Sequence, residues 1–144
     1  MGKKRIIRKQ GGSVDQGLKA RALARAAKKR VERGTLNILA TYNNTIVTLT
    51  DKQGNTLMAS SSGSLGFKGA KKSTPFASAK IGELIAEKAL QMNMSQVDVV
   101  IRGVGPGRES AMRSFAAKGI AISAIRDATP VPFNGPRLKK ARRV

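Results

Sequence analysis

Residues 97–125 read VDVVIRGVGPGRESAMRSFAAKGIAISAI and hold the pattern that decides the fold. A largely apolar run, 97–101, predicts a strand, and a glycine-rich turn leads from it into a predicted helix, 108–118, which ends at Gly119. A second apolar run, 120–125, predicts another strand. Nearly continuous apolar strands on either side of a helix are typical of a parallel pair that is buried on both faces and joined by a right-handed crossover.

A longer helix is predicted upstream of this unit. Thr74-Pro75 is a strong helix start, because threonine caps the free N–H groups of the first turn and proline suits the first helical position. One side of the helix is an apolar stripe made of Ala77, Ile81, Leu84, Ile85, Ala89 and Met92. The other side carries Lys80, Glu83, Glu87 and Gln91. This periodicity predicts an amphipathic helix.

Three shorter segments before that helix alternate apolar with polar residues or are rich in β-branched residues. They are 36–42, 45–50 and 56–62, with turn sequences at 43–44 and 51–55. We therefore expect a three-stranded antiparallel meander in front of the helix. Together with the parallel pair, the expected fold class is α/β: a mixed five-stranded sheet with helices, in three layers.

Positive charge is concentrated at the two ends of the chain. The 144 residues carry 28 Lys and Arg against 8 Asp and Glu, a net charge of +20. Residues 1–34 hold 12 of these cations with 2 acids, and residues 137–144 hold 5 cations with none. Such ends are suited to a phosphate backbone, because each neutralised phosphate releases counterions. Solvated tails that bind nothing are the alternative.

Each end has its own composition. Residues 1–14 contain little apolar content, and 15–33 predicts a helix that is cationic on most sides. In the tail, three prolines within 130–136 exclude a helix, and Asn134-Gly135 indicates a tight turn before five cations. The expected organisation is a basic N-terminal extension (1–34, helical over about 15–33), an α/β core domain (35–128) and an extended basic tail (129–144).

The composition argues against an enzyme. The sequence contains 0 Cys and 0 His, which excludes disulfides, thiolate chemistry, the usual zinc sites and histidine acid–base catalysis. The acids of the expected core lie in different elements or on the solvent side of a helix, so no converging carboxylates for a two-metal nuclease are expected. We expect no catalytic residue, no cofactor and no metal.

Membrane association is disfavoured as well. No apolar run approaches the roughly 18 residues of a membrane span, and the cationic helix lacks the apolar face of an interfacial one. The N-terminus is Lys-rich with one serine, unlike a transit peptide. A cytoplasmic protein is expected. An RNA- or DNA-packaging protein remains an alternative to a more specific RNA-binding role.

Two glycine-rich stretches precede predicted helices. The first, 63–74, carries Lys68, Lys71 and Lys72 up to a helix start, where free N–H groups favour anions. The second, 103–110, places Arg108 at a helix start but fails the G-x-G-x-x-G fingerprint of nucleotide cofactors. Phosphate contact is the favoured interpretation of both. The alternatives are a flexible loop for the first stretch and a purely structural turn for the second.

Aromatic residues are few. Phe76 and Phe115 suit core positions on the two helices. Phe67 in the first loop and Phe133 in the tail are equally suited to stacking on bases and to packing on a protein neighbour.

Several motifs together resemble one family. They are Tyr42-Asn43-Asn44-Thr45-Ile46-Val47-Thr48, Gly66-Phe67-Lys68-Gly69 with Ser73-Thr74-Pro75-Phe76-Ala77, Gly105-Pro106-Gly107-Arg108-Glu109-Ser110, and Asp127-Ala128-Thr129-Pro130-Val131-Pro132 with Asn134-Gly135. Their order and spacing over residues 35–144 are similar to those of small-subunit ribosomal protein eleven.

The resemblance implies a structural rRNA-binding protein of the small ribosomal subunit with a ribonuclease-H-like sheet that lacks the catalytic acids of that superfamily. It implies a position on the platform, bound to the central domain of the small-subunit rRNA, supporting assembly and the path of messenger RNA. Proteins seven, eighteen and, in bacteria, twenty-one would be neighbours. The ribosome would be cytoplasmic, with an organellar one as the alternative.

The charged helix and the family motifs together define the expected rRNA-binding residues. In the helix, the loops and the tail they are Lys28, Lys29, Arg30, Phe67, Lys68, Gly69, Lys71, Lys72, Arg108, Asn134, Gly135, Arg137, Lys139, Lys140, Arg142 and Arg143.

Overall fold

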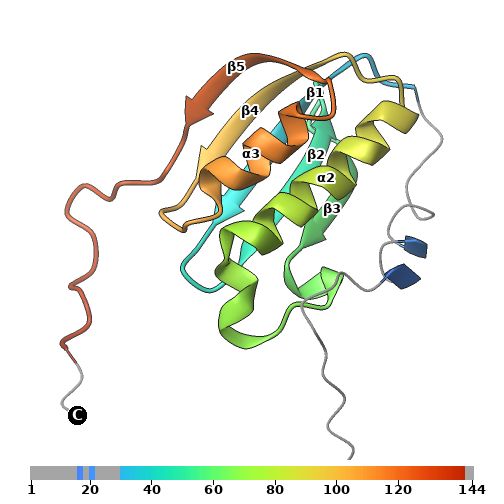
Figure 1. The fold of residues 1–144 in the computed structure, drawn as a ribbon. Coiled ribbons are helices and arrows are strands. Elements are labelled where there is room, and N and C mark those ends of the chain that lie inside the picture. Colours follow the sequence, from blue (N-terminus) through green and yellow to red (C-terminus); the bar gives the residue numbers. More distant parts are fainter. Residues whose placement is uncertain (1–15, 18–19, 22–29, 142–144) are drawn as a thin grey trace, which may run out of the picture.

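The computed structural model describes residues 16–17, 20–21 and 30–141 (Figure 1). Its sheet has five strands in the order β3-β2-β1-β4-β5. The strands are β1 (Arg33–Ala40), β2 (Thr45–Asp51), β3 (Thr56–Ser61), β4 (Gln96–Arg102) and β5 (Ala121–Asp127). The helices are α2 (Pro75–Gln91) and α3 (Arg108–Ala116), and two short 3₁₀ helices, η1 (Gly63–Leu65) and η2 (Gly69–Ser73), precede α2.

The strand directions follow the sequence pattern. β1, β2 and β3 form an antiparallel meander, while β4 is parallel to β1 and β5 is parallel to β4. The expectation of a mixed five-stranded sheet is confirmed. β3, β1, β4 and β5 therefore all run in one direction, and their C-terminal ends lie along one edge of the sheet.

The expectation of three layers is wrong for the described residues. α2 and α3 pack against each other on the same face of the sheet, which makes two layers (Figure 1). The strand order explains this arrangement. The connections β3–α2–β4 and β4–α3–β5 both advance in the same direction across the sheet, and two crossovers of one hand that advance in the same direction place their helices on the same face.

The expectation that the parallel pair is buried on both faces is also wrong for β5. Six of its seven residues are exposed, and Ile122 alone is half-buried against the core. β5 is one of the two edge strands, and α3 lies over β1 and β4 instead of over β5. An edge position beyond the cover of a helix leaves most side chains of the strand in solvent.

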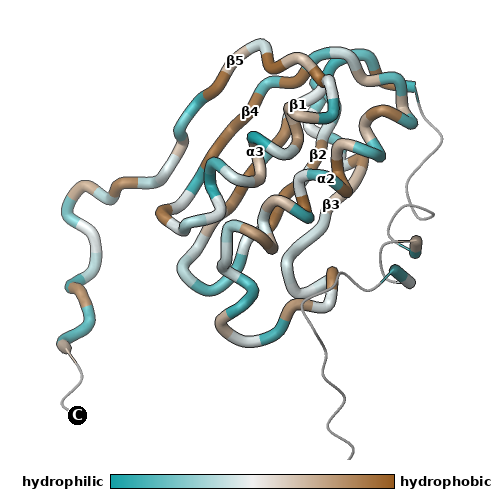
Figure 2. Tube along the Cα trace, viewed as in Figure 1, coloured by the Kyte–Doolittle hydropathy of each residue, from teal (hydrophilic) through white to brown (hydrophobic). Residues whose placement is uncertain are grey.

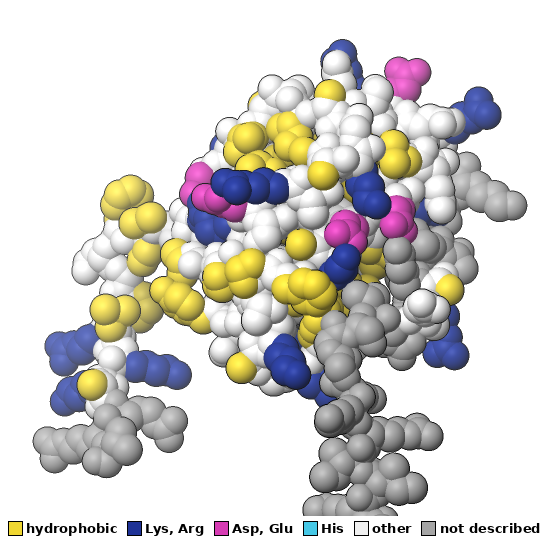
Figure 3. All heavy atoms as spheres, in the orientation of Figure 1, with side chains coloured by type: hydrophobic (Ala, Val, Ile, Leu, Met, Phe, Trp, Pro, Cys, Tyr) yellow, Lys and Arg dark blue, Asp and Glu magenta, His cyan; other side chains and the backbone are white. Residues whose placement is uncertain are grey.

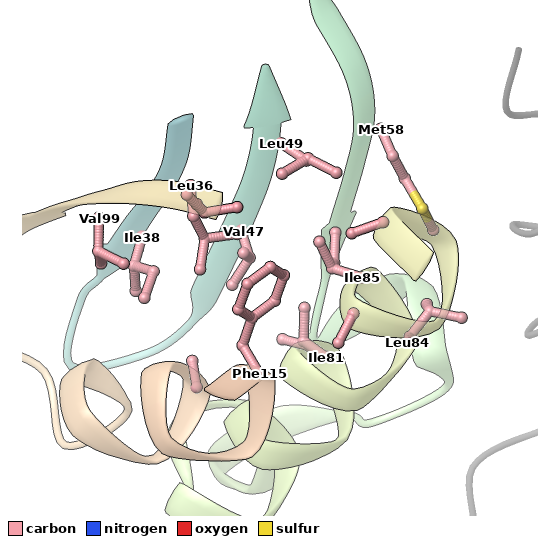
Figure 4. Packing of buried hydrophobic residues seen from close by; sticks show 14 of the residues in the cluster. Leu36, Ile38, Val47, Leu49, Met58, Ile81, Leu84, Ile85, Val99 and Phe115 are labelled. Atoms are coloured by element: carbon pink, nitrogen blue, oxygen red, sulfur yellow. The ribbon is translucent and has the colours of Figure 1, made fainter. Parts of the chain in front are cut away.

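The core lies between the sheet and the two helices (Figure 4). Leu36 and Ile38 point into this core from β1, Ile81 and Ile85 point into it from α2, and Phe115 of α3 is fully buried between the two layers. All six residues of the predicted apolar stripe of α2 are buried, which confirms the amphipathic pattern visible along that helix in Figure 2. No helix among the described residues is long and apolar enough to cross a membrane.

The start of the sheet corrects the end of the predicted N-terminal helix. That helix was expected over 15–33, but residues 30–32 are not helical and β1 begins at Arg33. The Val31 N–H donates to the carbonyl of Met92, the C-cap of α2, at 3.1 Å, so this segment is attached to the end of that helix just before β1 begins. Among the earlier residues, 16–17 and 20–21 are helical, and the rest of the predicted helix lies outside the described residues.

Candidate nucleic-acid interface

The C-terminal edge of the parallel strands gathers both glycine-rich loops. α2 and α3 start at this edge, because each runs back antiparallel to the strands that flank it (Figure 1). The loop before α3 lies between the other two segments: Gly105 and Arg108 line a hollow with Pro75 at the start of α2, and Arg108 reaches Thr129 just after β5. Edges of this kind commonly carry the binding residues of α/β sheets.

The loop before α2 is anchored by buried apolar side chains. Leu65 is 1% exposed and Phe67 is 7% exposed, and both belong to the core cluster. The Phe67 N–H donates to the Ser62 carbonyl at 3.2 Å, and the Ser64 hydroxyl donates to the Ser61 carbonyl at 2.7 Å. These contacts hold the loop against the end of β3. Beyond them Lys68 and Lys71 are exposed, and Lys72 is half-buried.

The start of α2 has the predicted cap. The Thr74 hydroxyl accepts from the Ala77 N–H at 3.3 Å and donates to the Lys71 carbonyl at 2.8 Å. Pro75 occupies the first helical position. The cap thus connects the η2 turn directly to the helix and sets where the backbone of Lys71 lies.

The glycines of the second loop serve close packing. A Cβ on Gly105 would lie 2.2 Å from the Thr41 carbonyl oxygen, and one on Gly103, whose φ is +91°, would lie 2.2 Å from the Ala40 oxygen. The Gly105 N–H donates to that Ala40 oxygen at 2.9 Å. The backbone of this loop packs directly on the backbone at the end of β1, so a side chain at either glycine would have no room. This geometry supports the structural-turn interpretation of these glycines.

Arg108 is occupied by partners within the chain. Its guanidinium donates to the Gly103 carbonyl and to the Thr129 hydroxyl, and forms an ion pair with Asp127. The Gly103 N–H also donates to the Thr129 hydroxyl, at 3.2 Å. This differs from the predicted phosphate contact. Arg108 joins the loop before α3 to the residues directly after β5, where the tail begins.

Asp127 completes this connection. The Thr129 hydroxyl, the Arg108 guanidinium and the Thr129 N–H lower the pKa of the Asp127 carboxyl from 3.8 to about 2. The carboxylate is therefore charged at neutral pH and neutralises Arg108. We call the network of Gly103, Arg108, Asp127 and Thr129 the tail root.

The tail beyond the root leaves the body of the protein. Residues 130–141 are exposed and form neither helix nor strand, as the prolines predict. Asn134 has a φ of +61° at the predicted turn. Arg137, Lys139 and Lys140 are exposed, and Figure 3 shows Lys and Arg side chains projecting from this segment.

The loops, the tail root and the tail all lie within one family match. The family model described as Ribosomal protein S11 matches residues 34–143, most of the chain.

The chain belongs to the ribosomal protein S11 family.

Membership confirms the resemblance drawn from the motifs and gives the protein its general role. Ribosomal protein S11 is a structural, rRNA-binding protein of the small ribosomal subunit and acts in translation. The match begins at Gly34, so the residues before β1 lie outside it. It covers both glycine-rich loops, the tail root and the basic tail.

Most of the predicted S11 site lies on two separate segments among the described residues. Lys68, Gly69, Lys71 and Lys72 follow one another in the loop before α2, and Asn134, Gly135, Arg137, Lys139 and Lys140 follow one another in the tail. Arg30 is exposed where the chain approaches β1. The predicted residues Lys28, Lys29, Arg142 and Arg143 lie outside the described residues.

Phe67 and Phe76 differ from the burial predicted for them. Phe67, predicted to contact RNA from its loop, is buried, because the loop folds back over the core. Phe76, predicted to be core, is 56% exposed on the first turn of α2. Phe115 is fully buried as predicted, and Phe133 is 97% exposed. Helical periodicity could have found Phe76, because it precedes the apolar stripe by one residue.

The acids at this edge are paired. Asp127 belongs to the tail root, and Glu109 pairs with Arg113 at 2.9 Å. Within the described ranges, no group of three or more His, Cys, Asp and Glu side chains could hold a metal ion. Asp127 and Glu109 are therefore neutralised by partners within the chain.

Proposed function

We propose that this S11-family protein binds the central domain of the small-subunit rRNA at the platform, through the C-terminal edge of its sheet and its basic tail. The arrangement of that edge is the observation that carries the proposal. An anchored loop presents Lys68 and Lys71 there, and the tail with its cations starts from the same edge. Cations on two segments that diverge from one edge suit a folded RNA, whose phosphates lie on several sides.

The finer parts of the proposal follow from the family. The protein supports subunit assembly and the path of messenger RNA beside proteins seven, eighteen and twenty-one, in a cytoplasmic or organellar ribosome. It is not an enzyme. The sheet order β3-β2-β1-β4-β5, with an antiparallel first half and a parallel second half, supports a ribonuclease-H-like topology.

We further propose a division of labour along the chain. Residues 35–128 act as the rigid core domain, while 1–34 and 129–144 act as basic extensions that contact RNA. The rRNA-binding residues would be those predicted in the loops, the tail and the N-terminal extension, except that Phe67 and Arg108 would act by holding the loop and the tail root.

A binding comparison tests the proposal. The purified chain is titrated against a transcript of the rRNA central domain and against a transcript of another rRNA domain of equal length. We expect tighter binding to the central domain and association of the chain with isolated small subunits. Equal affinity for both transcripts would instead indicate a general RNA-packaging protein.

A further inference from the structure

Phe76 is a large aromatic side chain with an unusual exposure for its position. It lies in the first turn of α2, directly after the capped start of that helix, and 56% of it is exposed. Isolated exposed apolar residues are normal on protein surfaces, so exposure alone indicates nothing. The surroundings of this ring distinguish it from such residues.

The ring of Phe76 is held from within by a second ring. Its centroid lies 6.1 Å from that of Phe67, with an angle of 83° between the planes, which is an edge-to-face contact. Phe67 is itself buried in the core cluster. An exposed ring supported by a buried one is presented in a defined orientation, so little conformational entropy is lost when a flat ligand stacks on it.

The segment just before this ring is positively charged. Lys71 and Lys72 lie in the 3₁₀ turn before the helix. The Lys80 ammonium lies over the Phe76 ring, 5.8 Å from its centre, but it is paired with Glu83 at 2.9 Å, so the unpaired charge comes from the turn. Between Asp51 and Glu83 the sequence contains no acid at all. Figure 3 shows exposed hydrophobic side chains over the beginning of α2, with Lys and Arg side chains beside them.

An aromatic ring among cations is the arrangement by which proteins bind unpaired nucleotides. The ring offers a face on which a base can stack, and the cations neutralise the phosphates next to that base. A protein partner would need acidic side chains placed opposite Lys71 and Lys72. A nucleotide carries both the flat apolar surface and the negative charge in one unit.

We propose that the Phe76 ring is a stacking platform for an unpaired base of the bound RNA, with Lys71 and Lys72 at the adjoining phosphates. This inference rests on the proposed RNA-binding function and adds to it. It assigns the loop before α2 to a single-stranded or bulged nucleotide, whereas the tail contacts phosphates without regard to base pairing.

Substitutions at this one position test the inference in the full-length chain. Phe76→Leu keeps an apolar side chain but removes the aromatic face, and Phe76→Tyr keeps the face. Base stacking on an aromatic residue implies that Phe76→Leu weakens binding to the central-domain transcript by roughly 5- to 150-fold. The factor should be similar at low and high salt, because no charge is lost. Phe76→Tyr should bind within about twofold of the parent.

A fluorescent reporter gives a second readout. The chain contains 0 Trp, so Phe76→Trp introduces a single tryptophan whose emission should be quenched when a base stacks on it. Leu90→Trp is the matched control, because Leu90 is 44% exposed near the other end of the same helix. Its emission should change little on RNA binding. Circular dichroism melting of each variant establishes that the fold is retained.

The outcomes separate this inference from the proposed function. If the parent binds the transcript, and Phe76→Leu binds as tightly while the Phe76→Trp emission stays unchanged, the stacking inference is wrong and RNA binding stands. A Phe76→Leu chain that binds free rRNA normally but fails to enter small subunits would point to a protein contact and would also overturn it. If the parent itself does not bind rRNA, the proposed function fails, and the stacking inference fails with it.

Discussion

The basic tail should determine much of the salt dependence of rRNA binding. The perturbation is a full-length variant in which all five tail cations become glutamine, so that chain length and the proline-rich segment are retained. The substituted residues are Arg137, Lys139, Lys140, Arg142 and Arg143. The first three are exposed and form no ion pair with another described residue, so their charge is available to phosphates.

The expected change in the salt dependence follows from counterion release. Each neutralised phosphate contributes about 0.9 to the slope of log affinity against log salt. Five tail contacts therefore contribute a slope of about 4 to 5, and removing them should flatten the dependence by that amount. Between 50 and 200 mM salt, the parent should lose on the order of 500-fold more affinity than the variant.

Filter binding to the central-domain transcript over this salt range measures the effect. Arg113→Gln is the control, because Arg113 already pairs with Glu109 at 2.9 Å. Its loss should change the slope by less than about 1. Parallel salt plots for the parent and the tail variant would contradict this prediction, since they would mean that the tail contacts no phosphate.

Three further predictions concern the fold and the tail root. Phe115→Ala should lower the free energy of unfolding by about 3–5 kcal/mol in urea denaturation, because the ring is fully buried between the layers; a loss below about 1 kcal/mol would contradict that packing. Gly105→Ala should lower the free energy of unfolding by about 1–3 kcal/mol, because the added Cβ would lie 2.2 Å from the carbonyl oxygen of Thr41, the residue after β1. An unchanged melting temperature would argue against this close approach. The lowered pKa of Asp127, about 2 against 3.8, means that its contribution to stability is present above about pH 4 and is lost as the pH falls toward 2. The urea midpoints of the parent and Asp127→Asn should therefore differ at pH 6 and converge on acidification, and a constant difference would exclude the carboxylate as the cause.

Much of the fold could be predicted from local patterns. Thr74-Pro75 identified the start of α2, the alternation at 36–42 identified β1, although that strand ends at Ala40, and the apolar run at 97–101 identified β4, because capping and periodicity depend on neighbours along the chain. The end of the N-terminal helix was misplaced, because Val31 bonds to Met92, some sixty residues away. A pattern of neighbouring residues cannot predict a hydrogen bond between such distant residues.

The candidate site, too, could be predicted from the sequence only in part. The lysines of the loop and the tail could be predicted, because charge at a chain end or in a glycine-rich loop remains in solvent wherever the core forms. The partners of Arg108 within the chain could not be predicted. Its partners Gly103 and Thr129 follow different strands, and their meeting depends on β4 and β5 ending side by side.

What the sequence determined by itself was the set of elements, their directions and the excess of positive charge at the ends, since these follow from spacing and composition. Tertiary structure alone decided that the layers number two in the described residues, that Phe67 is inside while Phe76 is outside, and that Asp127 and Arg108 connect the tail to the sheet. The physical reason is that layer number and side-chain burial depend on which distant segments become neighbours. That choice is made by the packing of the whole chain.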